Sequence, residues 1–324
     1  MRKLLVILMA MVPMALWAQF APAAGQPGTT AMHADSSAFV AWATDITVER
    51  GLMQINNPSL GYASYGPDIT DALGAPDGVS VVSLGDGGSA VLTFGSPICN
   101  GEGPDFAVFE NGFENAQQSG MYFLELGFVE VSSDGVNFFR FPAITRVQTE
   151  TQLGGFACID PCQIHNFAGK YAAMYGTPFD LDDVEDNPLL DKNNVTHVKI
   201  IDVIGNIDPE YATYDSEDHP VNDPWPTPFN SSGFDLDAVG VIHDIEHLAV
   251  AENEEERMTI YPNPAHDVMT IETHGRASQQ TIIVCDVTGR VILTTTESRI
   301  NVSGLEPGVY FVRVGSVVKR LIIR

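Results

Sequence analysis

The apolar residues between positions 38 and 245 come in short runs, and Gly, Asp, Asn or Pro follows each of them. Runs such as SAVLTF, NFFRF and VTHVKIIDVI are rich in β-branched and aromatic residues, which is typical of strands bounded by turns. No long stretch keeps a helical period, although LDDVEDNPLLDK (181–192) has room for a short helical turn. The sequence therefore predicts an all-β fold, a jelly-roll β-sandwich over residues 38–247.

Size and charge limit the classes of protein to which this chain can belong. With 324 residues, of which 44% are hydrophobic, the chain has enough apolar material for one large core and a smaller one. Asp and Glu outnumber Lys and Arg by 42 to 16, for a net charge of −26. Binding to nucleic acid requires clustered basic residues, so we expect no nucleic-acid partner.

The first residues are typical of export. Residues 1–18 combine the basic pair Arg2 and Lys3 with an apolar run, as in a secretory signal peptide. This run is short for a membrane-spanning helix, which needs ~20 residues, and no later stretch qualifies, so we expect a chain that does not span the membrane. Residues 19–37 are rich in Pro, Ala, Gly and Ser and predict a flexible leader.

A second domain follows an acidic linker. Within the linker, residues 248–257, five of the seven residues from Ala251 to Arg257 are charged; such side chains cannot bury apolar area and therefore predict a solvated connection. Short strand-like runs resume at residue 258, with turns at Thr288-Gly289 and Pro307-Gly308. Residues 258–324 are predicted to form a small immunoglobulin-like β-sandwich.

Four motifs in this second domain occur in a known order: YPNP (261–264), DVTGRVI (286–292), SGLEPGVYFVRV (303–314) and KRLIIR (319–324). Together they resemble the C-terminal sorting domain of the Bacteroidetes type IX secretion system. The resemblance implies that the type IX machinery is a partner and carries the chain across the outer membrane. It further implies removal of this domain and a secreted protein at the cell surface or in the extracellular space.

The first domain carries a different resemblance. VEVSSDGVNFFRF (129–141) is similar to a strand-turn-strand of discoidin-like, galactose-binding jelly rolls. The wider segment, including LGAPDG, GPDFAVFENGF and DPWPTPFNSSGFDLDAVGVI, resembles an uncharacterised family of bacterial cell-surface proteins. These resemblances imply the fold and the location of the domain, and imply no particular activity.

Acidic and amide side chains gather in the turns of the first domain. Calcium takes ~6–8 oxygen ligands, and loops at the rim of a jelly roll bring such oxygens together. Asp235 and Asp237 are two positions apart and would share one face of a strand. The alternative is that these residues form turns by bonding to their own backbone. The predicted calcium ligands are Asp105, Glu110, Asn111, Asp235 and Asp237.

Aromatic residues in turn-rich segments suggest a binding surface, because rigid rings beside acids and amides suit sugar rings or another flat ligand. Most of these rings are expected to fill the ends of the sandwich. Trp225, which prolines surround in DPWPTPF, and Tyr175 are predicted to be exposed and to bind the ligand.

The four cysteines leave the disulfide pairing open. Cys158 and Cys162 bridge locally, or one of them reaches Cys99. Cys285 lies in the alternating run TIIVCDV and is predicted to be an isolated buried thiol.

Motifs for catalysis are weak. The sequence contains neither HExxH nor GxSxG, and GDGGS (85–89) lacks the Lys of a phosphate-binding loop. We therefore predict a non-enzymatic cell-surface protein that recognises a carbohydrate or another nutrient and is braced by calcium. The alternatives are an extracellular glycan hydrolase, which would use two carboxylates across a cleft, and a structural or adhesive surface protein.

Overall fold

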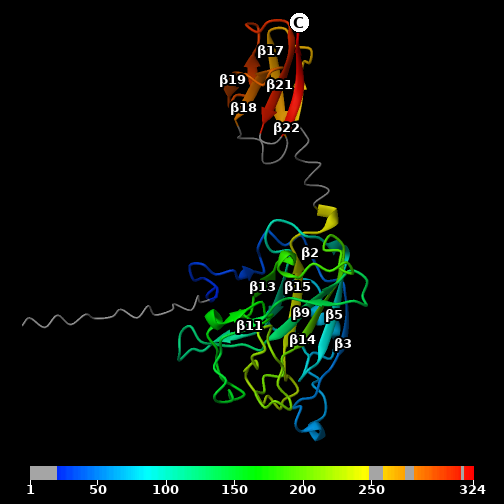
Figure 1. Ribbon diagram of the computed structural model, residues 1–324, viewed down its shortest axis with the longest axis vertical. Helices are drawn as coiled ribbons and strands as arrows, with labels where there is room; N and C mark the ends of the chain where they lie inside the picture. Colours follow the sequence, from blue (N-terminus) through cyan, green and yellow to red (C-terminus); the bar gives the residue numbers. More distant parts are fainter. Residues whose placement is uncertain (1–19, 248–257, 274–280, 315–316) are drawn as a thin grey trace, which may run out of the picture. The chain divides into compact units, whose positions relative to one another are not determined.

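The computed structural model describes residues 20–247, 258–273, 281–314 and 317–324 (Figure 1). The chain divides into two compact units, and the boundary falls between His243 and Asp244. Each unit is described by itself below. The predicted acidic linker, residues 248–257, and the signal peptide, residues 1–18, lie outside the described residues.

The N-terminal unit is a sandwich of two antiparallel sheets, which confirms the predicted all-β fold. The first sheet has the order β1-β13-β6-β15-β2, and β4 also pairs with β15. Its strands are β1 (Met32–His33), β13 (Tyr175–Phe179), β6 (Phe106–Glu110), β15 (Asp235–Val241), β2 (Ala41–Trp42) and β4 (Val82–Ser83). The second sheet has the order β10-β9-β14-β5-β3. Its strands are β10 (Phe139–Arg140), β9 (Gly127–Ser132), β14 (Val195–Asp202), β5 (Ser89–Ile98) and β3 (Asp45–Glu49), most of which are labelled in Figure 1.

The main core lies between these two sheets. In β14 the buried positions include Val198, Ile200 and Asp202, while Lys199 between them is half-buried, as expected for a strand with one face in the core. The apolar members meet Phe106 and Val239 from the first sheet in one cluster. Asp202 ends the inward row, so the pattern that builds the core also buries a carboxylate at one end of it.

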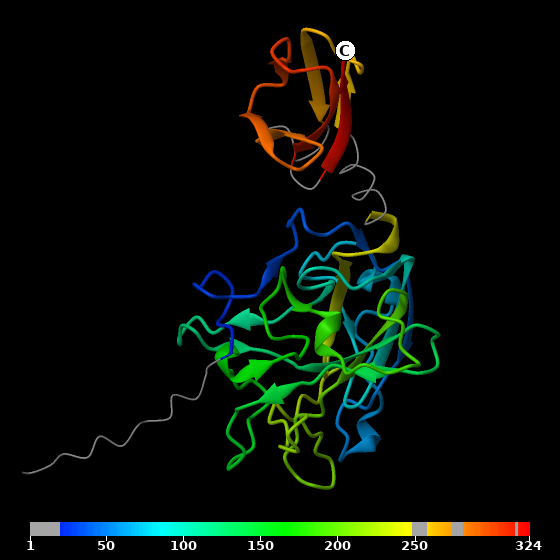
Figure 2. The ribbon, with the colours of Figure 1, turned by 45° about the horizontal axis from the view of Figure 1, so that its top comes forward.

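The outer face of the first sheet is covered as well, and β15 is buried along its whole length. Phe39 and Trp42 pack on Phe109 with ring centroids 5.6 Å away in each case. Met32 also packs against this outer cluster, β1 pairs with β13, and the Phe20 amide donates to the Cys162 carbonyl at 3.0 Å. The prediction of a flexible leader over residues 19–37 is therefore wrong for its described part, which lies against the unit (Figure 2).

Short strand pairs and 3-10 helices lie in the connections between the strands of the sandwich. Strand β7 (Phe113–Glu114) pairs with β8 (Tyr122–Phe123), and β11 (Ile144–Thr145) pairs with β12 (Ile164–His165). The 3-10 helices are η1 (Pro58–Leu60), η2 (Ile69–Ala72), η3 (Pro161–Gln163) and η4 (Leu181–Asp183). Helix η4 is the short helical turn expected within residues 181–192.

The C-terminal unit has two further antiparallel sheets around its own core of buried aliphatic residues. One contains β16 (Met258–Tyr261), β17 (Val268–Thr273) and β20 (Arg299–Asn301). The other has the order β19-β18-β21-β22, with β19 (Val291–Thr295), β18 (Ile282–Asp286), β21 (Gly308–Val314) and β22 (Val317–Ile323). The edge strand β22 buries Leu321 and exposes Lys319 and Arg320, and this charge opposes unwanted sheet pairing.

The cysteines do not form the local bridge considered above. Cys158 and Cys162 are both free thiols of intermediate exposure. Burial and the neighbouring Asp160 carboxylate raise the pKa of the Cys162 thiol. Cys285 is half-buried on β18, so the prediction of a buried thiol is only partly met.

Candidate functional site

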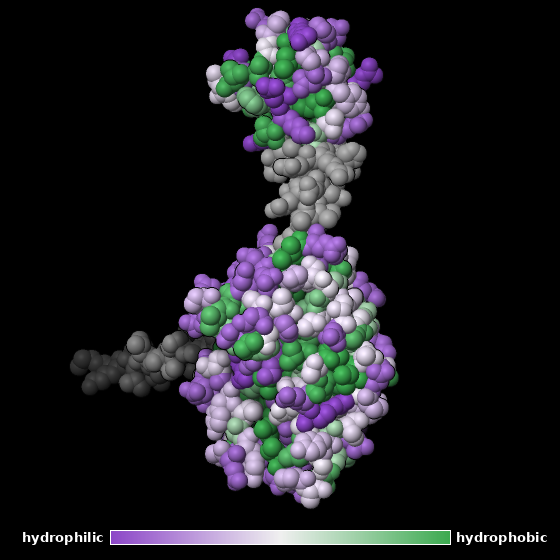
Figure 3. All heavy atoms as spheres, turned by 90° about the vertical axis from the view of Figure 1, so that its right-hand side faces the viewer, coloured by the Kyte–Doolittle hydropathy of each residue, from purple (hydrophilic) through white to green (hydrophobic). Residues whose placement is uncertain are grey.

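The surface of the N-terminal unit is not uniformly polar. On the face seen in Figure 3, apolar residues gather in the middle of the unit and polar residues surround them. Exposed apolar patches on an exported protein mark candidate interaction surfaces.

Four phenylalanines form one such surface, which we call the phenylalanine ledge: Phe113, Phe123, Phe156 and Phe229. Successive ring centroids are 5.2, 6.3 and 5.7 Å apart in that order. Phe113 is 57% exposed, Phe156 75% and Phe229 46%. The ledge is therefore a continuous series of rings of which three are largely open to solvent.

Two parts of the fold hold the ledge in place. Phe113 and Phe123 are direct partners across the β7–β8 ladder, which explains why their rings stack. Phe156 and Phe229 come from two loops that meet where Gly155 approaches the Pro226 carbonyl oxygen; a Cβ atom on this glycine would lie only 2.1 Å from that oxygen. The position thus excludes any side chain, and the close approach brings the two rings together.

The two residues predicted to bind a ligand lie elsewhere. Trp225 is only 8% exposed, and its indole Nε1 donates to Asp86 Oδ2 at 3.0 Å. The prediction that the Trp225 ring is exposed is wrong, because the ring is buried and its polar edge has a buried partner. Tyr175 on β13 is half-buried, and its ring meets His33 edge-on at 5.0 Å. Neither residue is part of the ledge.

The N-terminal unit also contains a group of buried acids that act on one another, the carboxylate cluster: Asp86, Glu110, Glu125, Asp202, Asp223 and Asp235. Burial is the largest cause that raises the pKa of each member. The pKa reaches about 6 for Asp86 and about 7 for Asp235. Repulsion from other members adds to the increase for Glu110, Glu125 and Asp202.

Most members of the cluster accept hydrogen bonds from the main chain. Asp202 accepts from the amides of Phe234 and Gly87, at 2.6 and 2.9 Å, and Asp223 accepts from the amide of Leu126 at 2.7 Å. These bonds place the carboxylates between loops that are distant in sequence. They also satisfy part of the hydrogen-bonding capacity that burial would otherwise leave open.

Two members are less well satisfied. Glu110 Oε2 accepts from the amide of Gly112 at 2.7 Å, but Glu110 Oε1 is buried without a hydrogen-bond partner. Glu125 Oε1 is also buried without a hydrogen-bond partner. An unpaired buried acceptor is costly, so these oxygens point to a group that the protein itself does not provide.

The cluster contains two of the five predicted calcium ligands, Glu110 and Asp235, and a third, Asn111, contacts it. Glu110 and Asp235 are close enough to repel each other, and the Asn111 side chain hydrogen-bonds Asp235. Asp105 lies at the opposite end of β6 from Glu110, roughly 16 Å away at ~3.3 Å per residue, so the two cannot share an ion.

Asp105 and Asp237 instead have structural partners. Asp105 accepts from the amides of Gly101 and Leu181 and contacts His243 Nδ1 at 2.8 Å. Asp237 accepts from the amides of Asp77 and Gly78 at 3.3 and 2.9 Å. A register shift in β15 next to Asp237 interrupts the simple alternation that had predicted a shared face with Asp235.

Glu125 and Phe156 are functional candidates that the sequence reasoning missed. Glu125 is a single acid inside the apolar run YFLELGF, and that isolation was the available signal. Phe156 follows two glycines in a segment without strand periodicity. Across the described ranges, no three His, Cys, Asp or Glu side chains converge in a metal-binding geometry, so an ion would need neutral oxygen ligands too.

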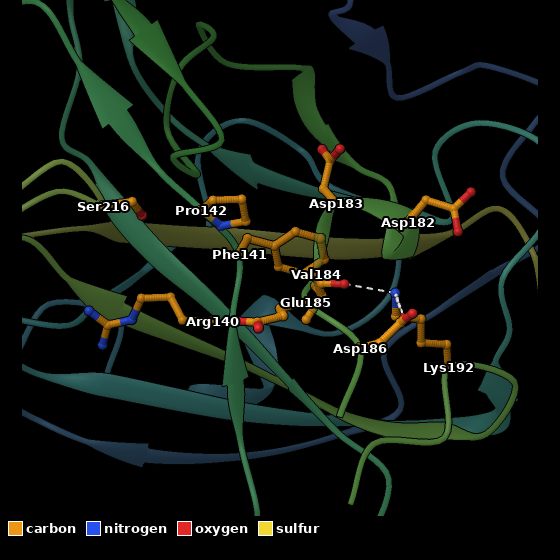
Figure 4. A pocket seen from close by; sticks show the side chains of 10 residues that line it. All are labelled: Arg140, Phe141, Pro142, Asp182, Asp183, Val184, Glu185, Asp186, Lys192 and Ser216. Atoms are coloured by element: carbon orange, nitrogen blue, oxygen red, sulfur yellow. Dashed lines mark hydrogen bonds and ion pairs between the residues drawn. The ribbon is translucent and has the colours of Figure 1, made fainter. Parts of the chain in front are cut away.

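A separate hollow of about 490 Å³ lies beside η4 and β10 (Figure 4). Phe141, Pro142 and Val184 form apolar parts of its lining. Its other lining residues are Arg140, Asp182, Asp183, Glu185, Asp186, Lys192 and Ser216. We call it the acidic hollow.

Most charges of the acidic hollow already have partners. Lys192 Nζ contacts Asp186 Oδ1 at 2.8 Å and donates to the Val184 carbonyl at 2.7 Å, as the dashed lines in Figure 4 mark. Arg140 points to Glu130 outside the hollow, with a contact of 2.8 Å. The remaining excess of carboxylates favours a cationic group over an anionic one.

A smaller hollow of about 280 Å³ lies on the outward face of the second sheet. Phe138 and His197 meet edge-on across it with centroids 6.4 Å apart, and Asp45 and Thr93 add polar groups. Neither hollow is lined by a member of the carboxylate cluster. The acids with raised pKa values are thus not presented to either hollow.

Comparison with known proteins identifies the C-terminal unit. Residues 259–324 match the family described as "Secretion system C-terminal sorting domain", as the motifs predicted. A type IX sorting domain indicates export to the cell surface or the extracellular space, with handling by the type IX machinery. None of the described helices has the length and apolarity to cross a membrane.

Comparison with solved structures gives a distant similarity. The chain is similar at 12% identity to a solved structure titled "Biofilm associated protein - BSP domain", with a TM-score of 0.26. The similarity covers 73% of this chain and 48% of that structure, so the chain spans about half its length. A TM-score this low supports no argument about fold or function. No curated protein matches the chain.

Proposed function

We propose that the N-terminal unit is a non-catalytic recognition module, exported by type IX secretion, that binds a glycan chain through the phenylalanine ledge. The observation that carries the proposal is the series of four neighbouring rings, three of them largely exposed, on loops at one end of the sandwich. Ring faces bind the apolar faces of sugars, and such contacts need no charged ligand.

Charge supports a neutral or cationic glycan as the occupant. The chain carries a net charge of −26, and Glu114 lies beside Phe113 on β7. Both features repel anionic polysaccharides.

A glycan hydrolase is the weaker candidate. Such an enzyme presents two carboxylates across a cleft that holds the sugar. Here Glu110 and Glu125 are fully buried, and neither of the two hollows contains them. An adhesive role through the same rings is the other candidate, since an exposed apolar patch also suits contact with a second protein.

The test is a binding screen with the purified chain against neutral, amino and anionic polysaccharides, run with calcium and again with chelator. Reducing ends released from each glycan are measured in the same samples. We expect retention on a neutral or amino glycan without product. Release of product would favour the hydrolase. Neither binding nor product, together with concentration-dependent self-association, would favour adhesion.

A further inference from the structure

We propose that Glu110 and Glu125 bind one divalent cation, with calcium as the best fit, at the base of the β7–β8 hairpin. The proposal concerns a metal site and stands independently of which ligand the ledge binds. Its foundation is the pair of buried carboxylate oxygens, Glu110 Oε1 and Glu125 Oε1, that have no hydrogen-bond partner.

The electrostatic surroundings of these two oxygens favour a bound positive charge whenever the carboxylates are ionised. Glu125 is repelled by Asp235, Glu110, Asp223 and Asp202, so several carboxylates act on one another within the same buried volume. Arg50 is the basic group that interacts with Asp235.

Arg50 interacts with Asp235 and makes no hydrogen bond to either glutamate. Its guanidinium donates to the main-chain carbonyls of Tyr65, Ser83 and Gly66, and it is only partly buried. Its hydrogen bonds therefore tie loops together without satisfying Glu110 or Glu125. Ionising the two glutamates without a bound cation would bury uncompensated charge, which is expensive.

The donor set identifies the kind of ion. Carboxylate oxygens, the amide of Asn111 and main-chain carbonyls are hard oxygen ligands, and calcium takes ~6–8 of these in a flexible geometry. Two glutamates balance the charge of one divalent cation. No soft or nitrogen ligand belongs to the cluster, which disfavours zinc and copper.

The position of the site links it to the loops above it. Glu110 ends β6 two residues before Gly112, and Phe113 of the ledge comes next. Glu125 lies two residues after Phe123, just beyond the end of β8. A Cβ atom on Gly112 would lie 2.9 Å from Glu110 Oε2 and 2.7 Å from the Phe123 carbonyl oxygen, so both strands converge here. One ion bound to both glutamates would hold the two strands of the hairpin at their base.

The experiment measures thermal unfolding of the purified full chain at pH 7.5, with calcium chloride and with chelator, for the wild type and for the Glu110→Gln/Glu125→Gln variant. We expect calcium at a hundredfold excess over its dissociation constant to raise the wild-type melting temperature by about 5–10 °C. The variant should melt higher than the wild type in chelator, because neutral amides relieve the repulsion, and should gain nothing from calcium.

Asp105→Asn is the matched control, because Asp105 is equally buried but lies at the other end of β6. This variant should lose stability and keep the calcium gain. Isothermal titration calorimetry should give one strong site in the wild type and none in the double glutamine variant. The proposal is overturned if calcium neither stabilises nor binds the wild type, or if the double variant retains the gain. In the first case the glutamates hold protons; in the second the ion binds elsewhere, for example in the acidic hollow.

Discussion

Glu110 and Glu125 lie close enough to repel each other, and each buries one carboxylate oxygen that has no donor. Glu110 ends β6 just before the β7–β8 hairpin and Glu125 follows the hairpin, so the repulsion acts at the base of the segment that displays Phe113 and Phe123. A protein can relieve such a contact with a proton or with a cation. Protonation and cation binding each have a measurable consequence.

The first prediction concerns pH in the absence of calcium. Burial raises the pKa of Asp235 from 3.8 to about 7 in the folded state and raises those of Glu110 and Glu125 in the same direction. The folded state therefore binds protons more tightly than the unfolded state between pH 4 and 7, and its stability falls as the pH rises through this window. The free energy of unfolding in chelator should be lower at pH 7.5 than at pH 5.

Urea unfolding at these two pH values checks this expectation. Exposed carboxyl groups whose pKa is lowered, such as Asp77 and Asp134, are ionised at both values and do not interfere. Equal stability at pH 5 and 7.5, or greater stability at 7.5, would contradict it. Adding calcium should restore stability at pH 7.5 more than at pH 5, since protons compete with the ion.

The second prediction assigns Trp225 a structural role. Trp225→Phe removes the indole donor to the buried Asp86 carboxylate, which should cost about 1–3 kcal/mol of stability. Glycan binding by the folded variant should match the wild type, because Trp225 is not part of the ledge. Lost binding at unchanged stability would show that Trp225 contacts the ligand after all.

The third prediction uses two adjacent glycines. A methyl group at Gly155 would meet the Pro226 carbonyl oxygen at 2.1 Å, whereas one at Gly154 would have nothing within 4 Å. Gly155→Ala should therefore separate the loops of Phe156 and Phe229 and weaken glycan binding, and Gly154→Ala should not. Binding isotherms of the two variants provide the comparison, and similar losses in both would count against the described loop contact.

The sequence predicted the architecture better than the site. Alternation in strands such as β14 follows from local chemistry, so runs of β-branched residues were sufficient to predict the sandwich. Trp225 was predicted to be exposed because prolines surround it, and its partner Asp86 lies 139 residues away in the chain. Partners this distant are brought together by tertiary packing, which no local pattern reports.

The same limit applies to the buried acids. In the sequence, Asp105 and Glu110 are both acids near turns. Only the extended strand β6 between them shows that they lie at opposite ends of the sandwich. The sorting domain was predictable because its signal is a set of ordered local motifs, which the family match over residues 259–324 confirms.

The fourth prediction concerns export. A chain that ends at residue 257 lacks the matched sorting domain, so it should accumulate on the periplasmic side of the outer membrane and be absent from the cell surface. Protease digestion of intact cells, followed by immunodetection of the N-terminal unit, measures this directly. Equal surface exposure of the truncated and full-length chains would contradict a sorting role for the C-terminal unit.

The central claim is that the phenylalanine ledge binds a glycan, and the most direct measurement is an equilibrium binding isotherm on the polysaccharide found in the screen. The Phe156→Ala/Phe229→Ala variant removes two exposed rings, and Val136→Ala removes an equally exposed apolar side chain from the turn between β9 and β10. We predict that the double variant loses affinity by about tenfold or more and that Val136→Ala binds like the wild type. Equal affinity of all three proteins would show that the ledge is not the binding surface.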